Sequence, residues 1–331
     1  MSDTDLNIAA GTELYLLADI PPSTREVYLH GCGDVIELPQ LPAHVEDLRL
    51  EYVVVSNIPH FTEGLKRLWI AGDVTNNSLA QWVFPSTLEY FSYVEFDGEA
   101  DLRSVTAKNI SVIPIQDTVD MVIFPEAIDE LELREEFVEL EIIPQSVTIL
   151  EIPEARGVSD RGIVFPEMES LTHGGIRSAL VKKIFPNLKR LGYHKSRISD
   201  TIVHPEVLEL VLDRCEGDMP VRLDIPKLES LVVFGSYYRR DVHLSKNTQL
   251  GETLVELTLD RVETFPIETE WERLESVTLI DTTLELPFIR WLKTLDTNRP
   301  VVTNGVSVAN INEYKSAWGF TSRRKGVLRA I

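Results

Sequence analysis

The chain has 331 residues, and 44% of them are hydrophobic, which is enough to bury a continuous core and argues against a disordered protein. Its 32 basic and 53 acidic residues give a net charge of −21, which argues against free nucleic acid or an anionic membrane surface as the main partner. This charge either keeps the chain soluble or steers a basic protein toward it.

The cysteines and the first residues of the chain indicate the compartment. Cys32 and Cys215 are far apart and have no Cys-x-x-Cys spacing, so they suit a reducing compartment better than a disulfide or a metal pair. Residues 1–5 are acidic and precede no long apolar run, so no signal peptide is expected. No stretch of about 18 apolar residues is present, so no membrane span is expected either. We therefore expect a cytoplasmic or nuclear protein.

One pattern, apolar-Pro-x-Leu-x-x-Leu-x-apolar, recurs along the chain, and residues 185–193 are a clear copy. The copies begin at Thr24, Val45, Leu65, Leu88, Ile128, Val147, Met168, Leu188, Val207, Leu228, Leu254 and Leu274. Most steps are 19 to 23 residues long. The 40-residue step after Leu88 predicts a degenerate copy at residues 110–115, and the 26-residue step after Leu228 predicts an insertion at residues 235–240. Such a period is the signature of a repeat architecture.

The Leu-x-Leu core of each copy predicts a short strand whose two leucines point to one face. One such strand cannot bury its apolar face alone, so the copies are expected to stack as parallel strands over a shared core. The proline lacks an N–H group and belongs in the return turn. The apolar residue before it is expected to fill the far side of the core, as at Phe84, Phe124, Phe165, Phe185 and Ile225. The prediction is a β-rich solenoid of about 13 coils of about 20 residues, with turns or 3₁₀ segments opposite the sheet.

Residues 24–286, which carry these copies, resemble the leucine-rich repeat proteins. The proline-bearing variant is similar to the short repeats of fungal F-box-type proteins and to FNIP-type repeats, although no Phe-Asn-Ile-Pro stretch occurs and the usual Asn or Cys is mostly missing. The resemblance implies a curved solenoid whose concave strand face binds another protein.

The ends of the chain differ from the middle, as capping units do. Residues 1–23 are expected to form an N-terminal cap with a strand at residues 13–17. Residues 287–309 are expected to form a C-terminal cap with a helix at residues 287–295 and a strand at residues 301–303. Residues 310–331 carry five basic residues and one acidic residue. This basic tail either docks on the last coil or is a mobile recognition or nuclear-localisation segment.

The sequence shows no catalytic or metal-binding signature. The pair His30 and Cys32 lacks further ligands at suitable spacing, and Gly174-Gly175 is a turn rather than a phosphate loop. We therefore expect no cofactor, no metal and no enzymatic activity. The residues before Thr24 are few and strand-like, so we do not expect them to form an F-box module.

The residues that flank the core leucines are predicted to face the concave surface and to bind the partner. These are Tyr28, Arg49, Arg67, Trp69, Tyr90, Glu130, Glu132, Glu151, Glu209, Asp213 and Phe234, with Tyr237 and Tyr238 on the insertion. The early aromatic and arginine residues are of the types that dominate binding energy, and the acidic residues favour a basic partner. The alternatives are that the aromatic residues are a local packing cluster and that the acidic residues form only a solvated face.

Two functions remain open. The first is a non-enzymatic adaptor, or a dedicated chaperone, that binds a basic protein segment. The second is a substrate-receptor or structural subunit of a larger assembly such as a ubiquitin ligase. The sequence does not indicate an oligomeric state.

Overall fold

The computed structural model describes residues 5–9, 20–72, 79–96, 99–115, 122–134, 140–153, 162–198, 201–216, 221–235, 249–250, 252–262, 273–284, 301–304 and 307–308. The chain divides into two compact units, Met1–Ile152 (unit 1) and Pro153–Ile331 (unit 2). Within the described residues, no helix has the length and apolar composition needed to cross a membrane.

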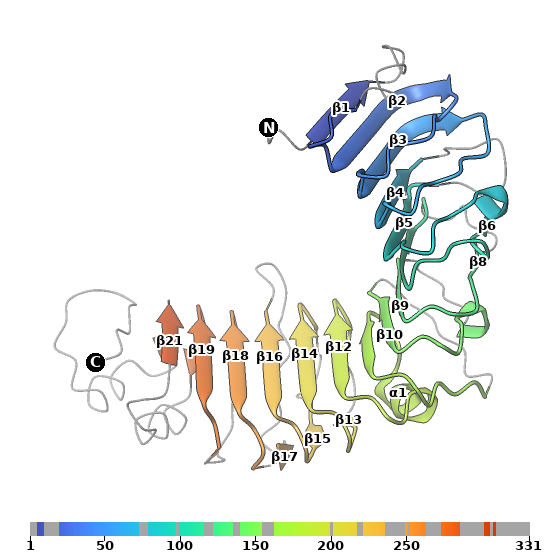
Figure 1. Ribbon diagram of the computed structural model, residues 1–331. Coiled ribbons are helices and arrows are strands. Elements are labelled where there is room, and N and C mark those ends of the chain that lie inside the picture. Colours follow the sequence, from blue (N-terminus) through green and yellow to red (C-terminus); the bar gives the residue numbers. More distant parts are fainter. Residues whose placement is uncertain are drawn as a thin grey trace, which may run out of the picture. The chain divides into compact units, whose positions relative to one another are not determined.

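Unit 1 contains a row of eight parallel strands (Figure 1). They are β1 (Asp5–Ala9), β2 (Glu26–Ile36), β3 (Asp47–Val55), β4 (Arg67–Ala71), β5 (Tyr90–Val94), β7 (Asn109–Ile113), β9 (Glu130–Leu133) and β10 (Ile149–Ile152). The return segments hold the short pair β6 (Ala100–Asp101) and β8 (Val122–Ile123), with 3₁₀ turns at Leu79–Gln81 and Leu140–Ile142.

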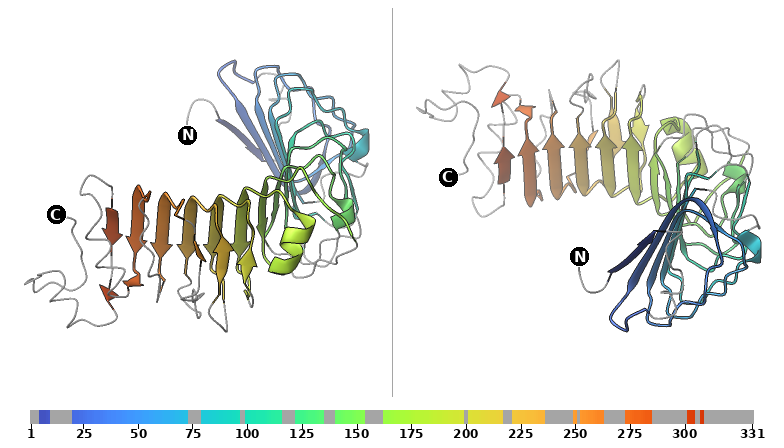
Figure 2. Two further views of the ribbon diagram at one scale, coloured as in Figure 1. Left: turned by 90° about the horizontal axis from the view of Figure 1, so that it is seen from below. Right: turned by 90° about the horizontal axis from the view of Figure 1, so that it is seen from above.

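Unit 2 contains a row of seven parallel strands, drawn from light green to red in Figures 1 and 2. They are β11 (Ser170–His173), β12 (Arg190–His194), β14 (Glu209–Asp213), β16 (Ser230–Phe234), β18 (Glu256–Asp260), β19 (Ser276–Ile280) and β21 (Val301–Asn304). Its return segments form two small parallel sheets. They contain β13 (Ile202–Val203), β15 (Leu223–Ile225) and β17 (Gln249–Leu250), and β20 (Thr283–Leu284) with β22 (Ser307–Val308).

The second and fourth positions of each strand form the core. In β3 these are Leu48 and Leu50, which are 1% and 0% exposed. Leu48 is the register partner of Leu68, and Leu210 is that of Leu231, so the leucines stack from coil to coil. The first, third and fifth positions face away from this core. The predicted parallel β-solenoid is confirmed. The strand count differs slightly from the predicted coil number, because β1 and β21 lie outside the repeated copies.

The apolar residues before the prolines are buried on the side of the core opposite the strands, as predicted. Phe165 and Phe185 are 1% and 0% exposed, and their rings stack at 5.5 Å between centroids. The proline itself lies in the turn that leads into the next strand: the Leu88 N–H donates to the Pro85 carbonyl at 3.2 Å. The proline is therefore outside the ladder, where its missing N–H group costs nothing.

A seven-residue helix, α1 (Ser178–Ile184), differs from the expected turns and extended segments. Its buried residues Ser178, Val181 and Ile184 recur every three residues and cover the core beside β13 (Figure 1). Lys182 and Lys183 lie in the last turn, where positive charge complements the helix dipole. With only two buried apolar residues, the segment is too short for a helical period to stand out in the sequence.

Most described coils turn sharply at the residue after the fifth strand position. Gly72 has a φ of 76°, and non-glycine residues take the same left-handed conformation at Tyr52, Lys195 and Arg214, with φ values of 50°, 45° and 49°. The N–H of this residue still donates to the next strand, as from Lys195 to the Asp213 carbonyl at 2.8 Å. The ladder therefore continues one residue beyond each strand before the chain turns away.

The next residue turns inward and bonds to the carbonyls of its own and the preceding coil. Ser196 Oγ donates to the Gly174 carbonyl at 2.7 Å, and Thr282 Oγ1 donates to the Leu259 carbonyl at 3.1 Å. Cys215 Sγ lies 3.2 Å from the Tyr193 carbonyl oxygen. In these coils the second residue after the fifth strand position is Ser, Thr or Cys, where the usual leucine-rich consensus has Asn or Cys.

The predicted ends are described only in part. The strand that pairs with β2 on its outer side is β1, and β21 confirms the predicted strand at residues 301–303. The predicted strand at residues 13–17, the helix at residues 287–295 and the basic tail at residues 310–331 lie outside the described residues.

Candidate functional site

The outward-facing side chains of unit 1 form straight rows, because the strands pair without a register shift between β3 and β10. The third strand positions form the central row. In order from β2 to β10 its residues are Tyr28, Arg49, Trp69, Ser92, Ser111, Glu132 and Glu151. The row therefore runs from aromatic and arginine residues, over two serines, to two glutamates.

A hollow of about 500 Å³ lies over the beginning of this row. We call it the aromatic hollow. Its lining residues are Glu26, Tyr28, Asp47, Leu48, Arg49, Glu51, Arg67, Leu68, Trp69 and Tyr90. Tyr28, Trp69 and Tyr90 are each half-buried, so each presents part of its ring to the hollow. The structure thus brings together the five predicted residues of strands β2 to β5.

Two lining residues of the aromatic hollow, Asp47 and Arg67, form an ion pair. The Arg67 guanidinium donates from Nη2 to Asp47 Oδ2 at 2.5 Å and from Nε to Oδ1. Asp47 is only 7% exposed, whereas the Arg67 side chain is 61% exposed. The hydrogen bonds to Asp47, together with its charge, raise the pKa of Arg67 above its usual value. Such two-pronged pairs fix geometry as well as charge.

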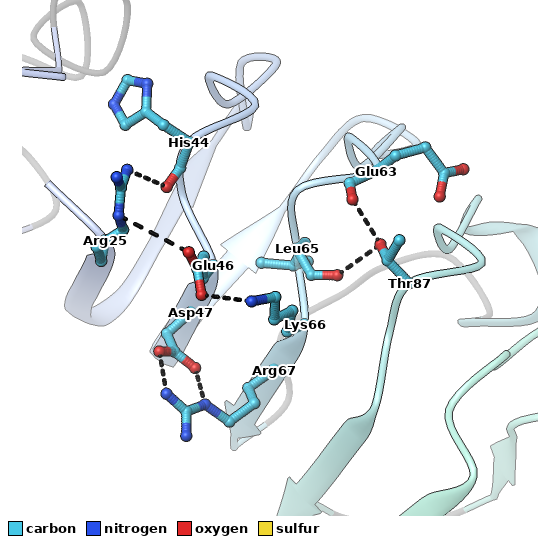
Figure 3. A network of polar contacts seen from close by, with 9 residues as sticks. All are labelled: Arg25, His44, Glu46, Asp47, Glu63, Leu65, Lys66, Arg67 and Thr87. Atoms are coloured by element: carbon cyan, nitrogen blue, oxygen red, sulfur yellow. Dashed lines mark hydrogen bonds and ion pairs between the residues drawn. The ribbon is translucent and has the colours of Figure 1, made fainter. Parts of the chain in front are cut away.

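A second network joins the same coils just before their strands (Figure 3). The Glu46 carboxylate accepts from Lys66 Nζ at 2.8 Å and lies 3.7 Å from Arg25 Nε. The hydrogen bond and charge of Lys66 lower the pKa of Glu46. Arg25 also donates to the His44 carbonyl at 3.0 Å. These exposed pairs hold neighbouring coils in register but contribute little stability each.

Arg49 differs from Arg25 and Arg67, because it has no ion pair or hydrogen bond with any described residue. It is exposed between its register partners Tyr28 and Trp69. Glu26 and Glu51 complete the lining, so the aromatic hollow carries three carboxylates and two guanidinium groups. It offers aromatic surface and groups of both charges to a ligand.

The other end of the unit 1 row is acidic. Glu130 occupies the first position of β9, and Glu132 and Glu151 occupy third positions. Glu132 accepts from Ser111 Oγ at 2.8 Å and from Arg134 Nε at 2.8 Å. Glu130 forms no ion pair with a described residue. The predicted acidic group of unit 1 therefore gathers on β9 and β10, away from the aromatic hollow.

The central row of unit 2 has a different character. Its residues are Thr172, Gly192, Val211, Val232, Thr258, Thr278 and Val302, which are small or β-branched and uncharged. A hollow of about 680 Å³ lies over part of this row. We call it the arginine hollow. Its lining residues are Thr172, Arg190, Gly192, Tyr193, His194, Val211, Asp213, Arg214, Phe234, Gly235, Asp260 and Arg261.

The carboxylates around the arginine hollow are paired within the protein. Asp213 Oδ2 lies 2.6 Å from His194 Nδ1, and its Oδ1 accepts from Arg214 Nε at 3.1 Å. Asp260 accepts from Arg261 Nη2 at 2.8 Å. Glu209 lies 3.3 Å from Arg190 Nε, although it is not part of the lining. The acidic residues predicted here to attract a basic partner thus already have cationic neighbours.

The predicted site residues therefore fall into separate groups. Five gather at the aromatic hollow, three lie at the acidic end of unit 1, Asp213 and Phe234 line the arginine hollow, and Glu209 pairs with Arg190 beside it. Tyr237 and Tyr238 lie outside the described residues. Arg214 and Arg261, which follow strands β14 and β18, were not among the predicted residues. Alternation along a strand does not indicate their direction, because the chain turns there in the left-handed conformation.

Two buried titratable groups among the described residues, His173 and Cys215, have strongly shifted pKa values. Burial lowers the pKa of His173 to about 3 and raises the pKa of the Cys215 thiol to about 12, so neither is poised for proton transfer or nucleophilic attack near neutral pH. Among the described residues, no three His, Cys, Asp or Glu side chains lie together in a way that could hold a metal ion.

Comparison with known proteins gives a fold likeness. No protein-family model matches the sequence, and no curated protein matches it. A solved structure, described as that of CroV588, a novel circular LRR protein, is similar to this chain with a TM-score of 0.46 and 12% sequence identity. The similarity covers 82% of this chain and 54% of that chain, so the chain spans about half the length of that protein.

The repeated coils of the chain define its fold class. Leu-x-Leu strands recur about every 20 residues and pair in parallel over one stack of leucines in each unit. This is a parallel β-solenoid of the leucine-rich-repeat type, consistent with the expected resemblance. Solenoids of this kind present an extended strand face on which other proteins bind.

Proposed function

We propose that the protein is a non-enzymatic interaction scaffold that binds a basic protein segment on the strand face of unit 1. The observation that supports this most is the continuous row from the aromatic hollow to Glu132 and Glu151. Half-buried Tyr and Trp rings suit the apolar anchor of a partner, because such residues bury large area at low entropy cost. The negative charge of Glu151, together with that of Glu132 beside its partner Arg134, suits lysine or arginine side chains of the same segment.

The spacing of the row sets the length of the bound segment. Trp69 on β4 and Glu151 on β10 are separated by four strand spacings, or roughly 19 Å at about 4.8 Å each. An extended segment covers about 3.3 Å per residue, so about six residues join the two ends. The proposed partner therefore carries an aromatic or aliphatic residue about six positions from a pair of basic residues.

The proposal is tested by affinity capture from the native cell with quantitative mass spectrometry. The baits are the wild-type chain, Tyr28→Ala with Trp69→Ala, and the control Thr258→Ala with Thr278→Ala, which changes two residues in the central row of unit 2. We expect a protein with a basic segment on the wild-type and control baits. It should be depleted at least about tenfold on the aromatic variant, as expected for loss of two aromatic anchors.

The salt dependence of capture separates this function from the second one. Partial loss of the partner between low and high salt supports electrostatic contact with the acidic end of unit 1. A salt-resistant assembly of several subunits, captured equally by all three baits, would refute the proposal and favour a structural or substrate-receptor subunit. The proposal includes a cytoplasmic or nuclear location, which microscopy of the tagged chain can test.

A further inference from the structure

We propose that the arginine hollow of unit 2 is a second binding site, of opposite charge preference, for an acidic protein segment. The ligand chemistry is a carboxylate next to an aromatic or aliphatic side chain. This goes beyond the function proposed above, since it concerns another unit and another class of partner. The site was not expected from the sequence, which predicted that Asp213 would help to attract a basic partner.

The first step is the shape of the hollow. Gly192 has no side chain in the central row, and a Cβ placed there would lie 2.9 Å from Thr172 Oγ1. The Thr172 side chain therefore already packs over the buried Gly192, and a larger residue at this position would have to displace it. Val211, the next residue in the row, and Phe234 are half-buried. Together they give the hollow an apolar floor that an aromatic or aliphatic side chain can cover.

The second step is the position of the guanidinium groups. Arg190, Arg214 and Arg261 reach the same hollow from strands β12, β14 and β18. Gly235 directly follows β16, the strand between β14 and β18, and Phe234 at the end of β16 is the register partner of both Asp213 and Asp260. The strands that Arg214 and Arg261 follow are thus two strand spacings apart, roughly 10 Å, with Phe234 between them.

The third step is charge. The lining has three arginines against two carboxylates, Asp213 and Asp260, on a chain whose net charge is −21. Asp213 is engaged by His194 and Arg214, and Asp260 by Arg261. Arg190 Nε lies 3.3 Å from Glu209 Oε1 and Arg214 Nε lies 3.1 Å from Asp213 Oδ1, and both arginine side chains are more than half exposed. Exposed guanidinium groups of this kind suit the paired oxygens of a carboxylate.

The test uses fluorescein-labelled peptides and fluorescence anisotropy with the full chain. The probe has alternating Glu and Phe residues between Gly-Ser flanks, and three matched probes carry Gln for Glu, Lys for Glu, or Ala for Phe. The double variant Arg190→Gln with Arg214→Gln removes two positive charges from the arginine hollow. The control, Arg177→Gln with Arg222→Gln, removes two positive charges from exposed positions outside it. Val211→Trp fills the hollow, and Thr278→Trp adds the same bulk to the same row at β19. Circular dichroism and thermal melting confirm that each variant folds.

The Glu-Phe probe is expected to bind, and the Gln and Lys probes to bind at least about tenfold more weakly, because charge-assisted hydrogen bonds are lost. The Arg190 and Arg214 variant should weaken binding by the same factor, and Val211→Trp should abolish it, whereas both controls stay within about twofold.

No binding of the Glu-Phe probe, or unchanged binding to Val211→Trp or to the variant of Arg190 and Arg214, would overturn the proposal. Loss of binding in Tyr28→Ala with Trp69→Ala would place the peptide at the aromatic hollow and would overturn it as well. Failure of the unit 1 proposal alone would leave these results unchanged.

Discussion

Asp47 on β3 and Arg67 on β4 are direct register partners, and the guanidinium of Arg67 donates to both oxygens of the Asp47 carboxylate. The Asp47 side chain is only 10% exposed, so its negative charge is compensated by this ion pair more than by solvent. Both residues also line the aromatic hollow. The ion pair therefore both stabilises the first coils and fixes the shape of the proposed binding face.

Replacing Arg67 by Met, which keeps the length of the side chain but removes its donors, should destabilise unit 1. The nearly buried Asp47 carboxylate would lose its partner, at a cost of about 1–3 kcal/mol in the free energy of unfolding. Lys108→Met is the control, because the Lys108–Asp129 pair is exposed on both sides and should be worth less than about 1 kcal/mol. Urea unfolding followed by tryptophan fluorescence measures both. Equal costs for the two variants would contradict this view of the pair.

The protein should lose stability as the pH falls from 6.5 toward 4. Burial lowers the pKa values of His173 and His204 to about 3 and about 4, so both are neutral in the folded chain and become protonated first in the unfolded chain. The unfolded state then binds more protons, and stability decreases with falling pH. At pH 5 the effect of His173 alone is about 2 kcal/mol.

The variant His173→Leu tests whether the buried histidine causes this loss of stability at low pH. Leu suits the fourth strand position, and the variant should lose about 2 kcal/mol less than the wild type between pH 7.5 and pH 5 in urea unfolding. His60→Leu is the control, because His60 is exposed. A pH dependence that does not change in His173→Leu would mean that this histidine does not contribute to acid sensitivity.

The left-handed turn after each strand predicts opposite effects of two substitutions. Gly72→Ala should destabilise the chain by about 1–2 kcal/mol, because the φ of 76° is strained for alanine and the new Cβ would lie 2.6 Å from Tyr52 Cδ1. Lys195→Gly should stabilise it by about 0.5–1 kcal/mol, because glycine takes the φ of 45° without strain. Thermal melting of both variants, compared with the wild type, tests the two predicted changes in stability. A gain from Gly72→Ala would show that the turn is not left-handed in solution.

The acidic end of unit 1 should contribute through charge alone. Glu132→Gln with Glu151→Gln keeps the shape of the row and removes two charges, so the affinity for the captured basic segment should fall and should depend less on salt. The control is Glu63→Gln with Glu89→Gln, which removes two exposed charges from positions before the strands of unit 1. A salt dependence that is the same in both variants would argue that the segment does not reach β9 and β10.

Much of the fold could be predicted because its determinants are local and repeated. The Leu-x-Leu spacing predicted strands at positions such as Leu48 and Leu210, and even the degenerate copy at Ile110 forms β7. The prolines indicated the turns because their backbone chemistry excludes them from the ladder. The helix α1 was missed because its seven residues carry only two buried apolar side chains, Val181 and Ile184.

The candidate sites were predictable only where side chains alternate along a strand. Tyr28, Trp69 and Tyr90 occupy outward positions and do meet at one hollow. The pairing of Asp213 with Arg214 was not foreseen, because it depends on a non-glycine residue with φ near 49° directly after the strand. Gly192, which lines the arginine hollow, was not predicted either, because a residue without a side chain leaves no signal in a pattern of large residues.

The central claim, that a basic protein segment binds along the face of unit 1, is tested most directly by photo-crosslinking in the native cell. A benzophenone amino acid replaces Tyr28 or Tyr90 in the aromatic hollow, or Thr258 or Thr278 in the central row of unit 2. The account predicts a crosslink from both tyrosine positions to one protein, at a site within about ten residues of a pair of lysines or arginines. Crosslinks to that protein from the threonine positions, with none from the tyrosine positions, would contradict it.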